Sequence, residues 1–139
     1  MIERRTQIRV RYKETDKMGI VHHSNYVVYF ETARTELLRE MGFTYRQMEE
    51  RGVMMPVVDV ALHYLAPAYY DDLLTVVIRI EHMPKARIEF RSEVYDEAGK
   101  LLNRGCVTLG FMDSVTRRPC RAPQWFTDIL RREGLSDDE

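Results

Sequence analysis

The sequence has few of the features that would place a protein outside the cell or in a membrane. It contains only two cysteines, Cys106 and Cys120, which are too few and too isolated to form a disulfide framework. No run of apolar residues approaches the length needed to span a bilayer. The first five residues, Met1 to Arg5, are not followed by the apolar stretch of a signal peptide. We therefore expect a cytoplasmic protein in a reducing compartment.

Basic runs and metal-binding motifs are also lacking. The formal net charge is −1 with 31% charged residues, and no long basic run favours nucleic-acid binding. The spacing of cysteine and histidine matches no zinc site, so no metal is expected. A length of 139 residues is enough for one domain with a real core. We predict a single domain over residues 1–139, with an acidic tail at 136–139 that frays.

The chain is organised around a loop that joins an alternating segment to an apolar helix. In residues 6–13, basic and apolar side chains alternate, which predicts a half-buried strand. Apolar residues then recur on one helical face up to Met41, and Gly42 is suited to ending that helix. Ser24 or Asn25 is a natural N-cap. Asp16 thus lies shortly before a helix N-terminus, which favours developing negative charge.

The second half of the chain reads as strands joined by turns. A short helix starts with a capping box at Thr44 and Gln47 and ends at Gly52. Alternation or apolar runs predict strands near 57–64, 74–80, 88–94 and 101–113, with a hairpin turn at 96–100. Pro123 suits the first turn of a last short helix. This pattern predicts an α+β domain.

Two parts of the sequence resemble a known family. They are similar to the hotdog-fold acyl-CoA thioesterases, in the YbgC-like branch of the 4-hydroxybenzoyl-CoA thioesterase family. The resemblance covers roughly residues 5 to 125 and implies an antiparallel sheet wrapped around a long central helix. The matching positions are Tyr12, Thr15, Asp16, Gly19, Val21, His23, Asn25, Tyr26, Phe30, Glu31, Ala33 and Arg34, then Tyr64 to Ala68 and Asp71 to Leu74.

The resemblance changes how Asp16 is read. Alone, it would be an ordinary solvated loop aspartate. In the family this aspartate acts at the thioester carbonyl, as a nucleophile or as a general base, and the sequence does not separate the two roles. His23 is expected to line the site. A backbone N–H near His23 and Ser24 is expected to bind the oxyanion, and Gly19 to allow a tight turn. His22 departs from the family pattern.

Other site residues are predicted with an ordinary structural alternative beside each. Glu31 could form an ordinary surface ion pair with Arg34. Its place after Phe30 and the family pattern favour a buried polar group that holds the loop or supports the site. Tyr26 could line the acyl pocket or simply pack in the core. Asp59 and His63 share one strand face and are assigned to a site wall or a subunit interface. Lys85 and Arg87 could simply be a solvated strand edge, whereas the resemblance implies that they contact CoA phosphates. Arg117, Arg118 and Arg121 are the alternative cluster.

The resulting hypothesis is an enzyme that hydrolyses an acyl-CoA to a free acid and CoA, without a metal or redox cofactor. Two rivals are a hydratase or dehydratase on the same fold and an acyl-CoA-binding module without catalysis. The hydratases carry an Asn-Pro step after the aspartate that is missing here. The apolar segment 53–63 predicts a homodimer with shared sites, and many relatives assemble as tetramers. The acyl group, and an acyl carrier protein in place of CoA, remain open.

Overall fold

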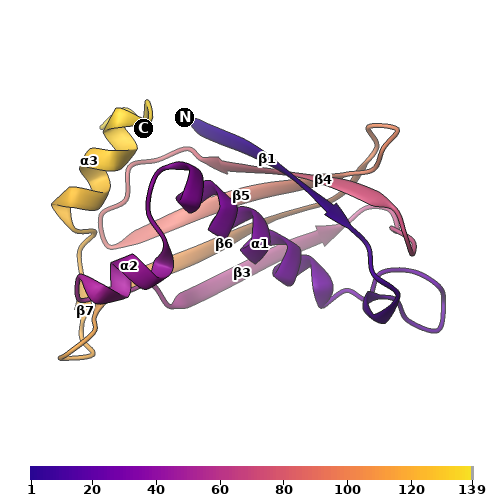
Figure 1. Ribbon diagram of the computed structural model, residues 1–139, viewed down its shortest axis with the longest axis horizontal. Coiled ribbons are helices and arrows are strands. Elements are labelled where there is room, and N and C mark those ends of the chain that lie inside the picture. Colours follow the sequence, from indigo (N-terminus) through magenta and orange to yellow (C-terminus); the bar gives the residue numbers. More distant parts are fainter. Residues whose placement is uncertain (139) are drawn as a thin grey trace.

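The computed structural model describes residues 1–138. Its elements follow one another in the order of Figure 1. They are β1 (Ile2–Arg9), the 3-10 helix η1 (Tyr12–Glu14), α1 (Asn25–Glu40), α2 (Tyr45–Glu50), β2 (Val53–Met54), β3 (Val57–Tyr64), β4 (Leu73–Ile80), β5 (Arg87–Tyr95), β6 (Leu101–Asp113), β7 (Pro119–Cys120) and α3 (Gln124–Arg132).

The strands form one antiparallel sheet of seven members. The long strands lie in the order β1, β4, β5, β6, with β3 on the other side of β6. The two short strands, β2 and β7, pair with the end of β6. Helix α1 runs across one face of this sheet, with β1 and β3 along its two edges (Figure 1). The α+β hotdog arrangement is therefore confirmed.

The core lies between α1 and the face of the sheet beneath it. Positions 26, 29, 30, 33 and 37 of α1 form one stripe, and each is at most 3% exposed. They join the buried alternate positions of β4 and β5 in one apolar cluster. Burying one large apolar side chain stabilises a fold by about 1.5–3 kcal/mol. Because the first two turns of α1 carry three aromatic rings of this stripe, the helix start is held firmly in place.

The local signals around α1 and α2 predicted these helices well. Gly42 follows α1 with φ of +97°, the left-handed conformation expected after a helix end. The capping box at Thr44 is present, since its hydroxyl accepts the amide of Gln47 at 3.2 Å. Pro123 lies one position before the first turn of α3, as the residue that precedes Gln124.

The prediction for the first strand was wrong at both ends. The strand begins at Ile2, which pairs with Ile80, and ends at Arg9. Val10 still donates a backbone hydrogen bond, to the carbonyl of Asp72, but the chain then turns into η1. The alternation of Arg11 and Lys13 with their neighbours therefore continues past the strand without forming part of it.

The described part of the acidic tail is tied back to α3. Asp137 accepts a hydrogen bond from Nε of Arg131 at 2.8 Å, and the fraying of residues 136–139 stays a prediction. Glu139 lies outside the described residues. Within residues 1–138, no helix is long and apolar enough to cross a membrane.

Candidate active site

Asp16 sits in a tight turn between η1 and α1. Its amide donates to the carbonyl of Ile20 and its carbonyl accepts from Gly19, both at 2.9 Å. One carboxylate oxygen, Oδ1, accepts the amide of Met18 at 2.8 Å. Gly19 has φ of +79°, so this turn requires a residue that tolerates the left-handed region, as predicted. The turn holds a half-buried carboxylate at one end of α1.

Glu14, which the sequence reading missed, braces this turn from inside. It is 5% exposed, and its carboxylate accepts the amide of Arg11 at 2.8 Å and the hydroxyl of Tyr29 at 3.0 Å. Its backbone carbonyl accepts from His22 at 2.8 Å and from the side chain of Asn25 at 2.9 Å. The usable signal was the spacing, because a glutamate three residues after Arg11 can reach back to that amide.

The start of α1 leaves backbone donors available, and the amide of His23 is one of them. Among residues 1–138, the amide of His23 has no hydrogen-bond partner, whereas the amide of Ser24 donates to Nδ1 of His22 at 3.3 Å. Ser24 does occupy the N-cap position, but its side chain caps nothing. It lies 2.8 Å from Nδ1 of His22 instead. The predicted position of the N-cap is therefore correct, but the side chain of Ser24 does not make the hydrogen bond to the helix that an N-cap normally makes.

Three aromatic rings pack around this helix start. The hydroxyl of Tyr64, from the end of β3, donates to the carbonyl of His23 at 3.2 Å. The ring of Tyr64 packs edge-to-face against the rings of Tyr26 and His23, with distances between ring centroids of 5.6 Å and 6.4 Å. Tyr26 is 3% exposed, and burial raises the pKa of its hydroxyl. Tyr64 is 51% exposed, so it forms the outer wall of this cluster.

The second family-like segment packs directly against the first. The amide of Val21 donates to the carbonyl of Ala68 at 2.8 Å, and Ile20 forms an isolated β-bridge with Tyr69. Asp72 accepts the amide of Tyr69 at 2.9 Å. Two stretches some fifty residues apart in the sequence thus form one rigid end of the molecule, which explains why both carry family-like residues.

The burial predicted for Glu31 was wrong. This side chain is exposed on α1, and the loop is held by Glu14 instead. The helical stripe explains the error. Consecutive residues on a helix point about 100° apart, so following the buried Phe30 does not place Glu31 on the buried face. The buried charged residue of α1 is Arg34, at 6% exposure, which donates to the hydroxyl of Tyr45.

Asp59 and His63 share a strand face, as predicted, but that face points away from α1. On β3, Leu62 contacts the same space as Phe30, and Tyr64 reaches the helix start, so even-numbered positions face α1. Odd-numbered positions therefore face the other side of the sheet. Within one chain the structure does not bring Asp59 or His63 onto the α1 side, where the helix start lies.

The predicted phosphate-binding residues lie at the far end of the sheet. Arg87 pairs with Gly110, next to the start of β3, while Tyr64 at the other end of β3 touches the start of α1. Seven residue steps along β3 correspond to about 23 Å. Lys85 and Arg87 are both exposed, and the carbonyl of Lys85 accepts from Ala122 at 2.7 Å, beside Arg121.

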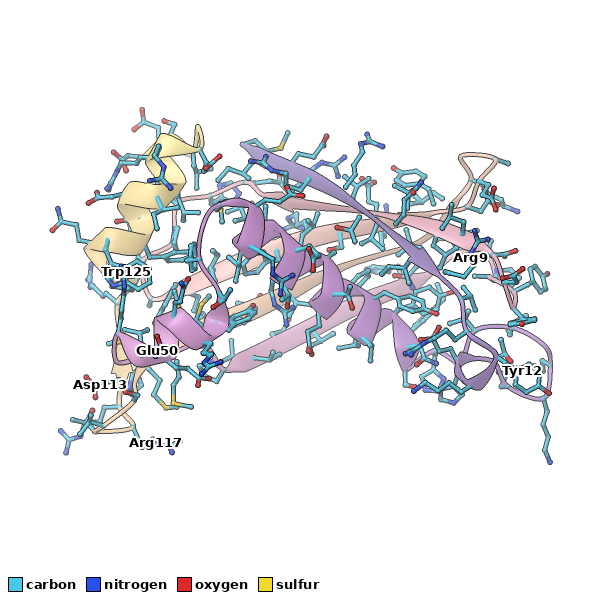
Figure 2. All side chains as sticks on the ribbon, viewed as in Figure 1. Arg9, Tyr12, Glu50, Asp113, Arg117 and Trp125 are labelled. Atoms are coloured by element: carbon cyan, nitrogen blue, oxygen red, sulfur yellow. The ribbon has the colours of Figure 1, made fainter. Side chains whose placement is uncertain are left out.

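Figure 2 shows the same separation, with Tyr12 at the Asp16 end and Arg117 at the opposite end. The two basic clusters considered in the sequence are thus neighbours at that opposite end. Arg87 also lines a groove of about 460 Å³ there, together with Asp59, His82 and Glu89. Within one protomer, the carboxylate of Asp16 and these cations therefore lie at opposite ends of the sheet.

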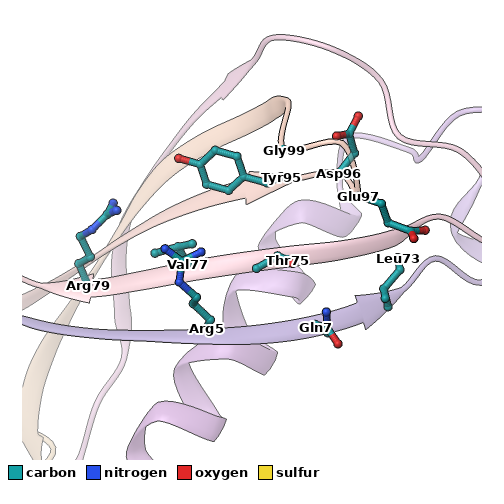
Figure 3. A pocket seen from close by; sticks show the side chains of 10 residues that line it. All are labelled: Arg5, Gln7, Leu73, Thr75, Val77, Arg79, Tyr95, Asp96, Glu97 and Gly99. Carbon is teal, nitrogen blue, oxygen red and sulfur yellow. The ribbon is translucent and has the colours of Figure 1, made fainter.

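A separate hollow of about 500 Å³ lies on the outer face of β1, β4 and β5 (Figure 3). Arg5, Arg79, Tyr95 and Glu97 line it, and α1 lies behind the sheet in this view. Arg79 is already paired with Glu3 and Glu93. The hollow is therefore on the opposite side of the sheet from the helix start. Over residues 1–138, no group of three acidic, histidine or cysteine side chains is arranged to hold a metal ion.

An antiparallel sheet wrapped around one helix, with a carboxylate-bearing turn beside the helix start, defines a hotdog domain. Comparison with known proteins places it more narrowly. The model of the thioesterase-like superfamily matches residues 10–130. The chain belongs to this superfamily.

Individual relatives agree over most of the chain. A putative acyl-CoA thioesterase, YneP, from Bacillus subtilis is 36% identical over 122 residues, 88% of each chain. The acyl-CoA thioester hydrolase YbgC of Escherichia coli is 32% identical over 120 residues, 86% of this chain and 90% of that one. The structure of a DHNA-CoA thioesterase from Staphylococcus aureus superimposes with a TM-score of 0.87 and 33% identity, covering 96% of this chain and 89% of that one.

Proposed function

We propose that this protein is an acyl-CoA thioesterase that hydrolyses its substrate to a free acid and CoA, with Asp16 as the reacting carboxylate. One observation carries the proposal. Asp16 is fixed in a hydrogen-bonded turn at the same end of α1 as the free amide of His23. A carboxylate beside an unpaired donor at a helix N-terminus suits attack on a carbonyl. Named thioesterases among the relatives support the same reaction.

The chemistry needs two groups from this chain. The amide of His23 donates to the thioester oxygen and stabilises the negative charge that develops there. Asp16 then acts in one of two ways. As a nucleophile, it attacks the carbonyl carbon and expels CoA thiolate, and water hydrolyses the resulting anhydride to the acid. As a general base, it takes a proton from the water that attacks directly. The ring of His23 lines the same end of the helix.

The working unit is proposed to be a two-fold dimer joined along β3. Among the described residues 1–138, strand β3 pairs with β6 alone, so its other edge has unpaired backbone groups. Val57, Val58 and Val60 are 39–51% exposed along it. An exposed apolar edge strand is a surface for pairing with another strand. Residues 53–55 are half-buried within the protomer, so the exposed part of the predicted interface is 56–63, in which Leu62 is half-buried.

Such a dimer would bring the two ends of the sheet together. If β3 pairs antiparallel with its copy about the middle of the strand, Tyr64 lies opposite Val57 of the partner subunit. The partner's Arg87 end then lies near the Asp16 end of the first chain. This is the arrangement in which Lys85, Arg87 and Asp59 would contribute to CoA binding at the same site as Asp16. Assembly of two dimers into a tetramer is also proposed.

Release of free thiol from a panel of acyl-CoA substrates tests the proposal. A thioesterase releases stoichiometric thiol, whereas a hydratase changes the acyl chain without releasing thiol, and a binding module does neither. The panel should span short aliphatic, long aliphatic and aromatic acyl groups, with the same acyl groups on an acyl carrier protein. Activity is expected without added metal or redox cofactor, and addition of EDTA to the assay checks the expectation about metal. We expect the enzyme to act in the cytoplasm. Absence of thiol release from every substrate would refute the proposed reaction.

A further inference from the structure

One charged side chain of the core is buried without a counter-ion. Arg34 of α1 is 6% exposed, and among residues 1–138 no carboxylate oxygen lies within 4.0 Å of its guanidinium nitrogens. Its Nε donates to the hydroxyl of Tyr45, and its guanidinium carbon lies 5.9 Å from the ring centres of Tyr45 and Phe90. Burying an ion is costly unless an opposite charge compensates it. Arg34 therefore calls for an anion that the described part of the chain does not supply.

Tyr45 also lines a hollow between α2 and the segment that precedes β3. The hollow has a volume of about 150 Å³, and its other lining residues are Met48, Glu49, Val53, Met54, Met55 and Pro56. An apolar cavity of about this size can hold a benzene ring. Methionine side chains adapt to the shape of the group that they contact. The hollow thus offers a small, largely apolar space with the bond between Tyr45 and Arg34 at its wall.

The proposed dimer would place this hollow beside the reacting end of the partner subunit. Pro56 directly precedes Val57, and α2 lies beside the start of β3 (Figure 1). In the proposed pairing, Val57 lies opposite Tyr64 of the partner subunit. Within each chain, the hydroxyl of Tyr64 donates to the carbonyl of His23 at 3.2 Å. The hollow of one chain would therefore lie next to the helix start of the other, where the thioester reacts.

We propose that this hollow holds the acyl group, and that Arg34 and Tyr45 bind a carboxylate at the far end of that group. The inference rests on the proposed thioesterase function and dimer, and it narrows the substrate to CoA thioesters of dicarboxylic acids. Charge-assisted hydrogen bonds from a guanidinium to a carboxylate are about twice as strong as neutral ones. The hydroxyl of Tyr45 can add a bond, because among residues 1–138 its proton has no acceptor.

Glu49 is the lining residue whose charge opposes an anionic acyl group. Its side chain is exposed on α2, where water and salt screen it, whereas Arg34 is buried. The attraction by Arg34 therefore exceeds the repulsion by Glu49. Glu49→Gln should raise the preference for carboxylated acyl groups about twofold, measured with the substrate pairs described next.

Matched substrate pairs test the inference. The ratio of kcat/KM is measured for adipoyl-CoA over 6-methylheptanoyl-CoA, and for glutaryl-CoA over 5-methylhexanoyl-CoA, in which an isopropyl group replaces the terminal carboxylate. The wild-type enzyme should favour the carboxylated member of at least one pair. Arg34→Met should lower that ratio about tenfold or more, with a smaller loss in Tyr45→Phe. Arg104→Met, at an exposed arginine of β6, is the control and should leave the ratio unchanged.

Mixed dimers test which chain supplies the arginine. A dimer of one Asp16→Asn chain and one Arg34→Met chain contains one intact site if Asp16 and Arg34 act together across the interface. Such a dimer should regain the wild-type ratio. If Arg34 served the Asp16 of its own chain, the mixed dimer would keep the ratio of Arg34→Met, and the proposed placement of the hollow would be overturned.

Two further results would overturn the inference. One is an unchanged ratio in a folded Arg34→Met protein. The other is an Arg34→Met monomer that hydrolyses both members of a pair equally slowly, since the arginine would then pair with a carboxylate of the partner subunit. If Arg34→Met does not fold, the Nε signal of Arg34 in wild-type protein decides, because it should shift with adipate and not with 6-methylheptanoate. Absence of thiol release from every CoA thioester would refute the proposed function instead.

Discussion

The hydroxyl of Tyr29 donates a 3.0 Å hydrogen bond to Oε1 of Glu14, and both side chains are buried. Tyr29 belongs to the second turn of α1, and Glu14 precedes Asp16 by two residues. This bond therefore connects the rigid helix to the turn that carries the proposed reacting carboxylate. Positioning of Asp16 depends on a residue that takes no part in the chemistry.

Removing the charge of Glu14 should loosen the turn. In Glu14→Gln, one carboxylate oxygen becomes an amide group facing the guanidinium of Arg11, which lies 3.3 Å from Oε2. We expect a loss of about 1–3 kcal/mol in the free energy of unfolding, measured with urea. The value of kcat should fall as well, because Asp16 is held less precisely.

Glu31→Gln is the matched control for this change. The same substitution is made on an exposed glutamate of α1, so stability and kcat should stay within the range of ordinary surface changes. Equal effects of the two substitutions would contradict the bracing role of Glu14.

Tyr29 also predicts how stability changes at high pH. Burial, followed by the hydrogen bond to Glu14, raises the pKa of Tyr29 above its ordinary value of 10.0. Above pH 10 the unfolded chain loses this proton while the folded chain keeps it, so the contribution of Tyr29 is complete below pH 10 and declines as pH rises further. Tyr29→Phe should lower stability at neutral pH and flatten this alkaline decline. Parallel urea titrations of both proteins between pH 8 and 11 give the comparison, and identical pH slopes would rule this role out.

Strand β3 predicts how the oligomer can be broken. Val60→Asp puts a charge on the exposed edge that we propose pairs with its copy, so it should produce monomers in light scattering. Thioesterase activity should fall with it, because each site would lose its partner's residues. Val115→Asp, at an 87% exposed position beyond β6, is the control and should remain oligomeric and active. A fully active Val60→Asp monomer would disprove the shared site.

The basic end of the sheet predicts an effect on substrate binding. Replacing Lys85 and Arg87 by Ala should raise KM more than it lowers kcat, because phosphate contacts are made in the ground state and the transition state alike. The same replacements at Arg117, Arg118 and Arg121 are the comparison, measured with the same acyl-CoA. A larger rise in KM from that set would move the phosphate site to the β6–β7 hairpin.

Local features of the fold were predictable because local chemistry determines them. The capping box at Thr44, the end of α1 at Gly42 and the turn at Gly19 were all predicted from neighbouring residues, and each is present. The start of β1 was missed because it depends on pairing with Ile80, nearly eighty residues away, which periodicity does not report.

The parts of the site that a sequence motif specifies were predicted correctly. The prediction failed where the role of a residue depends on whether its side chain is buried. The turn around Asp16 has the predicted form, although its catalytic role stays a prediction. Glu31 was predicted to be buried and is exposed, because its burial depends on which helical face it occupies. Glu14 is the buried glutamate, because it accepts a hydrogen bond from Tyr29, fifteen residues away in the sequence. The distance between Asp16 and Arg87 depends on strand directions that no single segment reveals.

The most direct test of the central claim is thiol release by Asp16→Asn, compared with wild-type protein on the best substrate of the panel. This nearly isosteric change removes the charge and basicity of the carboxylate and keeps an oxygen that can accept from Met18. We predict a fall in kcat of about a hundredfold or more, with an unchanged melting temperature and retained acyl-CoA binding. Wild-type turnover by a folded Asp16→Asn protein would contradict the mechanism.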